Sequence, residues 1–598
     1  MDDASRPIGI WRPAEVEGEA AFVRPEPGPF GDHWSDRRVI FRRCRREKRL
    51  CLLGESTAAG YLLAPHLTPA RALGARLGRR WDVVDLARTN ERLDGLAATA
   101  EAALQLDPDL LVVFTGNNCN LLETPSWSPY LPSGPARRRY AEALARGGIL
   151  GPAQGAAREL RTKIETTFAR LAALRLPVVV VAPEVNLADW ESPQPAPLLP
   201  GDGVRRWYGR LDAAREALAA GDPNAARHAA AALLELDGGA CPTGFRLLSS
   251  AAVAAGDLER ARTAARAEVD SCRYAHMAVL AAPQATATVQ ELLREGARRH
   301  RFGLVDLPEI LGRAERLPGR RWFYDYCHLT PEGIDLAMTA VARAVQDGVE
   351  PGGLPLSDRH RAAAELGAAV HGAHRGARGE IVRHWCRRAV ATSPAAAGAL
   401  LDLVRARAAP VPAVLTRAQI ENPWLTPQQG WRWEAYDAEV VAAAIDVLGQ
   451  AEVGPLLGPP RVEPWTPLDR FYPEAMEAEG VPPRALLRSP WPWTDYALVA
   501  QGPVEIEVVA RLPEGSAPGE FGVSHGGKVL TRRELDPAWR PVRAVVPARP
   551  GLSRLTLDWP LPAHAGQGAL ERAVARLRKG LEADVHPVFG EVFSARIV

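Results

Sequence analysis

The sequence predicts a mixed α/β protein with a parallel sheet, a helical insertion and a β-sandwich near the C-terminus. The first observation is a series of short apolar runs separated by helix-length periodic segments, which is typical of parallel sheets covered on both faces. The second is a four-residue motif that repeats in the middle of the chain. The third is an alternation of apolar and polar side chains from about residue 494 onward, which favours strands.

Five apolar runs define the expected parallel sheet. Helix-like stretches separate the first four runs, and the gap before the fifth is too long for one crossover helix. The runs are Leu50–Leu53, Val83–Ala87, Leu110–Phe114, Pro177–Ala182 and Gly303–Leu307.

The long gap contains the repeated motif Ala-Ala-Gly-Asp. Its two copies begin at Ala219 and Ala254, 35 residues apart, and each is followed by an Ala-Arg pair. This period resembles that of a tetratricopeptide helix pair, so we expect a helical insertion leaning on the α/β domain. Chance similarity between Ala-rich helices is the alternative.

Gly/Pro clusters and changes of composition divide the chain into regions. A Gly/Pro cluster at 350–355 marks one boundary, and a Pro-rich stretch at 454–467 precedes the strand-like region. The expected organisation is an N-terminal segment (1–35), a discontinuous α/β domain (36–200 and 285–347), the insertion (201–284), a helical segment (348–424) and a Trp-rich, β-sandwich-like domain (425–598).

Composition excludes several classes of protein. The 73 basic and 71 acidic residues give no reason to expect a nucleic-acid partner, and seven cysteines are too few for a disulfide scaffold. No apolar run reaches the roughly 18–20 residues that span a bilayer, and the N-terminus lacks the pattern of a secretory signal. We therefore expect a cytoplasmic protein without a membrane partner.

The first motif with chemical meaning follows the first apolar run. There the chain reads Gly54-Glu55-Ser56 and continues into a helix-like segment. A serine on such a strand-to-helix turn is exposed at the carboxyl end of the sheet, where a nucleophile can act. Alone the signal is weak, because Gly-x-Ser is common after strands.

The second motif places Asp325 three residues before His328. A carboxylate at that spacing can orient the imidazole, which can then take a proton from a serine and return it to a leaving group. Thr330 and Pro331 follow as the expected start of a helix. A surface turn is the alternative for a lone Asp-x-x-His.

The third motif, Gly116-Asn117-Asn118, follows the third apolar run at a carboxyl strand end. Ligand and catalytic groups gather at that edge of open α/β sheets. The side-chain amide of an asparagine there can donate a hydrogen bond to a developing oxyanion.

Along the chain the motifs follow the order Gly54-Glu55-Ser56, Gly116-Asn117-Asn118 and Asp325-x-x-His328. Together and in that order they resemble the motifs of the SGNH/GDSL hydrolase family over residues 36–200 and 285–347. The resemblance implies a flavodoxin-like, three-layer domain with Ser56 as nucleophile and Asp325 and His328 as its partners. It also implies an oxyanion hole formed by the Asn118 side chain, the Ser56 backbone N–H and a backbone N–H of the family's second motif.

The family's own second motif, Asn-x-x-x-x-Gly after the second strand, is not matched by this chain, which reads Asp85-Leu86-Ala87-Arg88-Thr89-Asn90 there. Asn90 stands where the family has glycine; asparagine tolerates the left-handed conformation better than most residues, so the loop can survive. Glu55 replaces the common aspartate before the serine. A narrower resemblance, to bacterial SGNH-like proteins with helical-repeat insertions, implies that Arg273 binds a substrate carboxylate, and Glu55 is expected to contact substrate as well. A surface arginine is the alternative for Arg273.

The expected function is therefore a serine hydrolase that cleaves an ester or other acyl bond, on a small molecule such as a specialised metabolite or on a peptide. Acyl transfer to an acceptor other than water is one alternative. An inactive scaffold that binds a ligand or a protein through the insertion or the C-terminal domain is another. No cofactor or metal is expected, because the chain has no C-x-x-C pair, Walker A motif or G-x-G-x-x-G loop after a strand.

Overall fold

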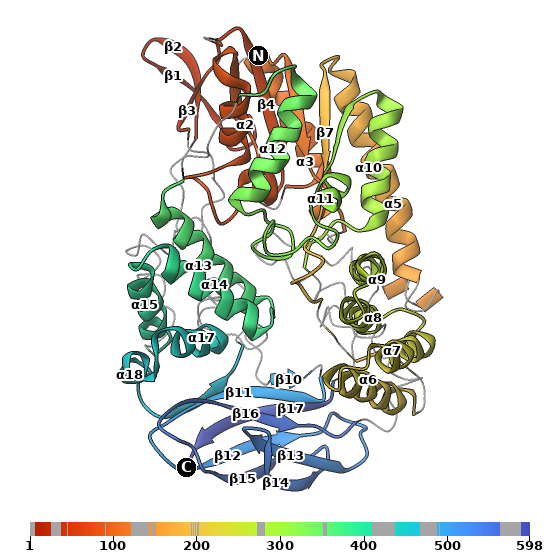
Figure 1. Cartoon of the computed structure of the whole chain (residues 1–598), viewed down its shortest axis with the longest axis vertical. Helices are drawn as coiled ribbons and strands as arrows, with labels where there is room; N and C mark the ends of the chain where they lie inside the picture. Colours follow the sequence, from red (N-terminus) through yellow and green to blue (C-terminus); the bar gives the residue numbers. More distant parts are fainter. Residues whose placement is uncertain are drawn as a thin grey trace.

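The computed structural model shows a mixed α/β protein, which confirms the predicted fold class (Figure 1). The residues described are 6–24, 37–44, 46–89, 91–120, 151–192, 202–271, 282–350, 356–408, 437–466, 487–489, 491–561 and 588–598, with short stretches at 141–142, 145–146, 194, 196–197, 199 and 574. Among these residues, no helix combines the length and apolar character needed to cross a membrane.

A five-stranded parallel sheet occupies the part of the chain where the five apolar runs lie. Its strands follow the order β5-β4-β6-β7-β8, so the second strand along the chain lies at one edge and the first lies beside the third. The strands are β4 (Lys48–Gly54), β5 (Trp81–Asp85), β6 (Leu110–Phe114), β7 (Val178–Ala182) and β8 (Gly303–Asp306). All residues of β5, β6 and β7 are buried, which explains the uninterrupted apolar character of β6 and β7.

The direction of the connections changes at β4, since β5 lies on one side of it and β6 on the other. In doubly wound sheets this change of direction leaves a crevice at the carboxyl ends of the two central strands. The topology therefore directs attention to the residues that follow β4 and β6.

Helices cover the sheet in two groups. In one group α5 contacts both α3 and α10, and in the other α2 contacts α12. The crossover from β4 through α2 to β5 and the crossover from β5 through α3 to β6 run in opposite directions along the sheet. Because both are expected to be right-handed, α2 and α3 lie on opposite faces. The bounds are α2 (Pro69–Leu77), α3 (Leu93–Ala103), α5 (Gly151–Ala173), α10 (Ala287–His300), α11 (Leu307–Ala314) and α12 (Pro331–Val345).

The predicted start of α12 is confirmed in detail. The Thr330 side chain accepts a hydrogen bond from the backbone N–H of Gly333 at 3.1 Å, and Pro331 occupies the first helical turn. A capping threonine satisfies one of the N–H groups that a helix start leaves without a partner. This cap fixes where the Asp325–His328 loop ends and the helix begins.

The insertion consists of four successive helices, each packed on the next: α6 (Gly203–Ala219), α7 (Pro223–Asp237), α8 (Pro242–Ala254) and α9 (Leu258–Ser271). Both Ala-Ala-Gly-Asp motifs form the turn between two helices. Gly221 and Gly256 adopt φ values of +74° and +76° there, a conformation that glycine adopts without strain. The motif therefore marks the turn of a helical hairpin.

A helical layer follows the α/β domain and continues beyond the predicted boundary at residue 424. Its members are α13 (Asp358–His374), α14 (Gly379–Thr392), α15 (Ala396–Ala408), α17 (Ala438–Leu448) and the short α18 (Gln450–Val453). Helix α17 packs against α14 and α15 through buried side chains that include Val440 and Val441. The change to a Trp-rich composition thus precedes the structural change from helices to strands.

The C-terminal region forms two antiparallel sheets, ordered β10-β17-β12-β15 and β14-β13-β16-β11-β9. Apolar side chains of both sheets, such as Ile506 and Phe521, share one core, as expected for a sandwich. The strands are β9 (Arg461–Pro464), β10 (Leu487–Ser489), β11 (Trp493–Ala500), β12 (Val504–Arg511), β13 (Gly519–His525), β14 (Lys528–Leu535), β15 (Arg540–Val546), β16 (Gly551–Asp558) and β17 (Gly590–Ile597).

The core of the sandwich continues into the insertion. Tyr208 on α6 contacts Phe589 with ring centroids 6.4 Å apart, and the Trp491 indole donates a hydrogen bond to the carbonyl of Gln194. Figure 1 shows the sandwich against both α6 and the helical layer that contains α17.

A small antiparallel sheet precedes the α/β domain. It contains β1 (Arg12–Val16), β2 (Glu19–Val23) and β3 (Val39–Phe41), paired in that order. Arg49, at the start of β4, is buried and forms an ion pair with Asp82 on β5 at 3.0 Å. Its guanidinium also donates a hydrogen bond to the Phe41 carbonyl of β3 at 2.9 Å, so this residue joins the small sheet to the parallel one.

Candidate active site

Ser56 lies at the carboxyl end of β4, half-buried, as the first residue of the short helix α1 (Ser56–Ala59). The turn before it requires glycine at position 54. A Cβ atom there would lie 2.1 Å from the Phe114 carbonyl oxygen and 2.5 Å from the Ala58 Cβ. The close approach of β4 and β6 thus determines where the serine emerges.

Asp325 and His328 lie on a tight loop between α11 and α12. The loop is closed by a backbone hydrogen bond from Tyr324 N–H to the His328 carbonyl at 2.8 Å. Inside it, Asp325 Oδ1 accepts the backbone N–H groups of Cys327 and His328, both at 2.9 Å. The Asn186 side chain, which follows β7, donates to the Asp325 carbonyl at 2.9 Å and fixes the loop from outside.

The loop brings His328 between Asp325 and Ser56. The His328 Nε2–Ser56 Oγ distance is 2.8 Å, and the His328 Nδ1–Asp325 Oδ2 distance is 2.6 Å. Both are hydrogen-bond distances, so a proton on Nδ1 leaves Nε2 free to accept the serine hydroxyl proton. The structure brings together the three residues on which the sequence motifs converged.

The electrostatics of Asp325 suit this arrangement. Its burial opposes ionisation, but the charge of His328 and the hydrogen bond from it outweigh the burial and lower the pKa of the carboxyl group to about 2. Asp325 is therefore ionised at neutral pH and can stabilise positive charge that develops on the imidazole.

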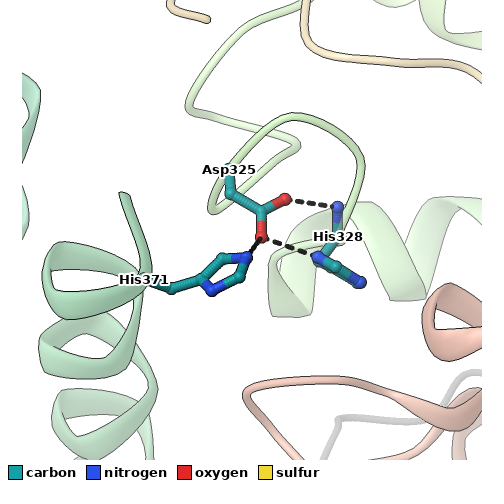
Figure 2. Close-up of side chains that lie close together, drawn as sticks. All are labelled: Asp325, His328 and His371. Atoms are coloured by element: carbon teal, nitrogen blue, oxygen red, sulfur yellow. Dashed lines mark hydrogen bonds and ion pairs between the residues drawn. The ribbon is translucent and has the colours of Figure 1, made fainter. Parts of the chain in front are cut away.

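His371, which no sequence motif marked, also contacts Asp325 (Figure 2). It comes from α13 in the helical layer, and its Nε2 lies 3.5 Å from the same Oδ2 that accepts His328. Its Nδ1 lies 3.5 Å from the Tyr61 hydroxyl. The helical layer thus contributes a buried side chain to the site, although it lies outside the residues covered by the family resemblance.

Two tyrosines surround the imidazoles. The Tyr61 ring lies 4.4 Å from that of His328 and 5.3 Å from that of His371, between centroids. Tyr326 lies 5.3 Å from the His328 ring. Both tyrosines and both histidines are buried, so the imidazoles lie in a packed aromatic environment.

Glu55 has a different place from the one expected. It is 2% exposed, and its two carboxylate oxygens accept four hydrogen bonds, from the Thr115 hydroxyl and the backbone N–H groups of Gly116, Asn117 and Asn118, at 2.6–3.1 Å. Burial raises the pKa of this carboxyl to about 7, against the lowering effect of those bonds. This position does not fit the expected contact with substrate. Instead, the Glu55 carboxylate holds the Gly116-Asn117-Asn118 loop beside Ser56.

The side chains of Asn117 and Asn118 are both buried. The Asn118 amide donates to the Glu91 carbonyl at 3.1 Å, which uses one of its two N–H groups. Asn117, which the motif analysis did not assign a role, donates to the Thr57 hydroxyl at 3.2 Å and accepts from the Ala285 backbone N–H at 3.0 Å. Asn117 therefore anchors the loop on both sides, and Asn118 keeps a second donor.

The segment after β5 continues beside β4. Backbone N–H groups of Leu86 and Arg88 donate to the carbonyls of Leu52 and Gly54 at 2.9 and 3.1 Å. This pairing places residues 86–88 beside the end of β4, next to the turn that bears the serine. Asn90 and Arg273, expected in the oxyanion hole and in substrate binding, lie outside the described residues.

Asp325, His328 and His371 are also the group of potential metal ligands found in the described part of the chain, with ligand atoms within 4.8 Å of one another. A divalent ion there would compete with bonds already formed, since His328 Nδ1 and Asp325 Oδ2 are joined at 2.6 Å and His328 Nε2 meets Ser56. The donor set therefore fits a hydrogen-bonded relay better than a metal centre.

In comparisons with known proteins, no family model matches the chain, and no curated protein matches it significantly.

Proposed function

We propose that the chain is a serine hydrolase of the SGNH type that cleaves an ester or related acyl bond through an acyl-serine intermediate. The observation that carries the proposal is the continuous relay from Ser56 Oγ through His328 to the buried carboxylate of Asp325, at 2.8 and 2.6 Å. A serine in such a relay can lose its proton as it attacks a carbonyl carbon.

The fold supports the same proposal. The order of the five parallel strands is that of a flavodoxin-like sheet, in which ligands bind where the connections change direction. Ser56 and the Gly-Asn-Asn loop follow β4 and β6, the strands on the two sides of that point. The resemblance of the motifs and the strand order thus both support the proposal of an SGNH-type fold.

Each proton transfer of the proposed reaction is assigned to a named side chain. His328 takes the Ser56 proton during attack and then gives it to the leaving group, which yields the acyl-serine and the free alcohol. Water, activated by the same imidazole, attacks the acyl group and releases the acid. Asp325 keeps the proton on Nδ1 and stabilises the imidazolium.

The negative charge on the carbonyl oxygen needs donors in the transition state. The second N–H of Asn118 and the backbone N–H of Ser56 are the proposed donors among the described residues, and each such donor contributes about 10²–10³ in rate. The hydrogen bonds to Glu55 fix the loop before substrate arrives, so that no reorganisation is needed during the reaction.

Hydrolysis of p-nitrophenyl acetate tests the proposal. We expect wild-type turnover and a loss of about 10³-fold or more in Ser56→Ala, while Ser393→Ala, at the end of α14, stays at the wild-type rate. Activity that persists in Ser56→Ala would assign hydrolysis to another residue. Product analysis in the presence of a low concentration of an alcohol distinguishes hydrolysis from acyl transfer, because a transferase forms more of the new ester than of the acid although water is far more concentrated.

A further inference from the structure

A cavity of about 350 Å³ lies between the segment 320–332 and helices α13 and α14. This volume is in the range of small-molecule sites. It is separate from the relay, since neither Ser56 nor His328 lines it. Its lining residues are Arg320, Arg321, Tyr324, Thr330, Glu332, Arg361, Glu365, His384, Trp385 and Arg388.

The lining carries an excess of positive charge. It contains four arginines and two glutamates. Two of the arginines pair with those glutamates, at 2.8 Å for Arg361–Glu332 and 3.1 Å for Arg388–Glu365. A third arginine pairs with Asp189 outside the lining.

The fourth, Arg321, has no carboxylate partner in the described part of the chain. Its guanidinium lies 4.6 Å from the centre of the Trp322 ring, which orients it without neutralising it. One guanidinium of the lining is thus exposed and free to bind an anion.

Buried donors line the same cavity. Tyr324 and Trp385 are 3% and 2% exposed, and neither the tyrosine hydroxyl nor the indole N–H has a hydrogen-bond partner among the described residues. Their rings meet edge to face at 5.1 Å, so both polar groups belong to one rigid unit. An indole N–H can only donate, and a buried donor without an acceptor is rare in proteins.

We propose that this cavity binds the oxyanion group of a small molecule, a phosphate or a carboxylate. Arg321 supplies the charge, and Tyr324 and Trp385 supply neutral donors to the same group of oxygens. A planar guanidinium with nearby donors suits anions whose oxygens accept several hydrogen bonds at once. The inference does not depend on the proposed hydrolase activity, because it uses other residues.

Isothermal titration calorimetry on the full chain tests the proposal, with sodium phosphate and sodium acetate as probes at constant ionic strength. The informative variants are Arg321→Gln and Tyr324→Phe. The second removes only a hydroxyl that has no partner, so it should leave the thermal midpoint unchanged or higher. Arg532→Gln, an exposed arginine of the sandwich, is the matched control.

We expect saturable binding of at least one anion, weakened about tenfold or more in Arg321→Gln or Tyr324→Phe and unchanged in Arg532→Gln. Preference for phosphate or for acetate identifies the group that the site accepts. The proposal is overturned if neither anion binds below about 10 mM. Equal affinity in wild type and both cavity variants also overturns it, since the anion would then bind elsewhere.

Discussion

Raising the pH from 4.5 to 8 should destabilise the α/β domain through one carboxyl group, that of Glu55. Burial raises its pKa to about 7, against 4.5 for an unperturbed glutamate. The folded state therefore binds a proton more tightly than the unfolded state. The resulting stabilisation is fully present below about pH 4.5 and is lost as the pH rises through about 7.

The size of the effect follows from that difference in pKa. At about 1.4 kcal/mol for each pKa unit, the free energy of unfolding should fall by about 3 kcal/mol across this pH range. For a domain of this size, that corresponds to a drop of roughly 6–12 °C in the thermal midpoint.

Glu55→Gln isolates this contribution, because glutamine does not titrate. The thermal midpoint of each protein is measured as a function of pH from 4.5 to 8. Between these two pH values, the midpoint of wild type should fall by 6–12 °C more than that of Glu55→Gln. Other buried carboxyl groups, such as that of Asp437, affect both curves equally. Glu309→Gln, an exposed glutamate of α11, should keep the wild-type slope.

Parallel curves for wild type and Glu55→Gln would refute this reasoning. They would mean that the four hydrogen bonds to the carboxylate compensate for its burial and that Glu55 is ionised across the whole range.

Three further predictions concern activity and assembly. His328→Ala should lower kcat for p-nitrophenyl acetate by 10³-fold or more. His66→Ala, which removes a histidine with no carboxylate partner in the described structure, should change kcat by less than about threefold. Equal losses in the two variants would contradict the relay. His371→Asn should lower kcat by up to about tenfold and leave KM unchanged, because the His371 side chain acts through Asp325. If the variant keeps the wild-type kcat and pH–rate profile, this positioning role is excluded. Removal of residues 487–598 should preserve p-nitrophenyl acetate cleavage but expose the apolar face of the insertion that includes Tyr208, which dye binding to exposed apolar surface would detect; an unchanged dye signal would contradict the shared core.

Much of the fold could be predicted because its signals are local. Strands β6 and β7 are short runs of buried apolar residues, and the Thr330-Pro331 cap marks a helix start within four residues. The turns at Gly221 and Gly256 are equally local, since the motif itself creates the conformation.

The parts that sequence analysis missed depend on contacts between distant segments. His371 lies on an Ala- and Arg-rich helix with no motif around it, and only the packing of α13 against the Asp325 loop brings it to the site. Glu55, which precedes the serine in the sequence, was expected to contact substrate. Its side chain turns inward instead, because the loop after β6 offers three backbone N–H groups and a hydroxyl there.

The same reasoning explains the boundary at residue 424. Composition changes there, but α17 belongs to the preceding helical layer through packing that no single segment encodes. The arginine-rich cavity has the same origin, since it forms where α13 and α14 meet the loop.

The most direct test of the central proposal is intact-mass spectrometry of the full chain after treatment with a fluorophosphonate. The relay predicts a single adduct on wild type, none on Ser56→Ala and strongly reduced labelling of His328→Ala, because the serine reacts only when the imidazole accepts its proton. Equal labelling of wild type and Ser56→Ala, or no adduct on wild type together with no cleavage of a short-chain ester, would contradict it.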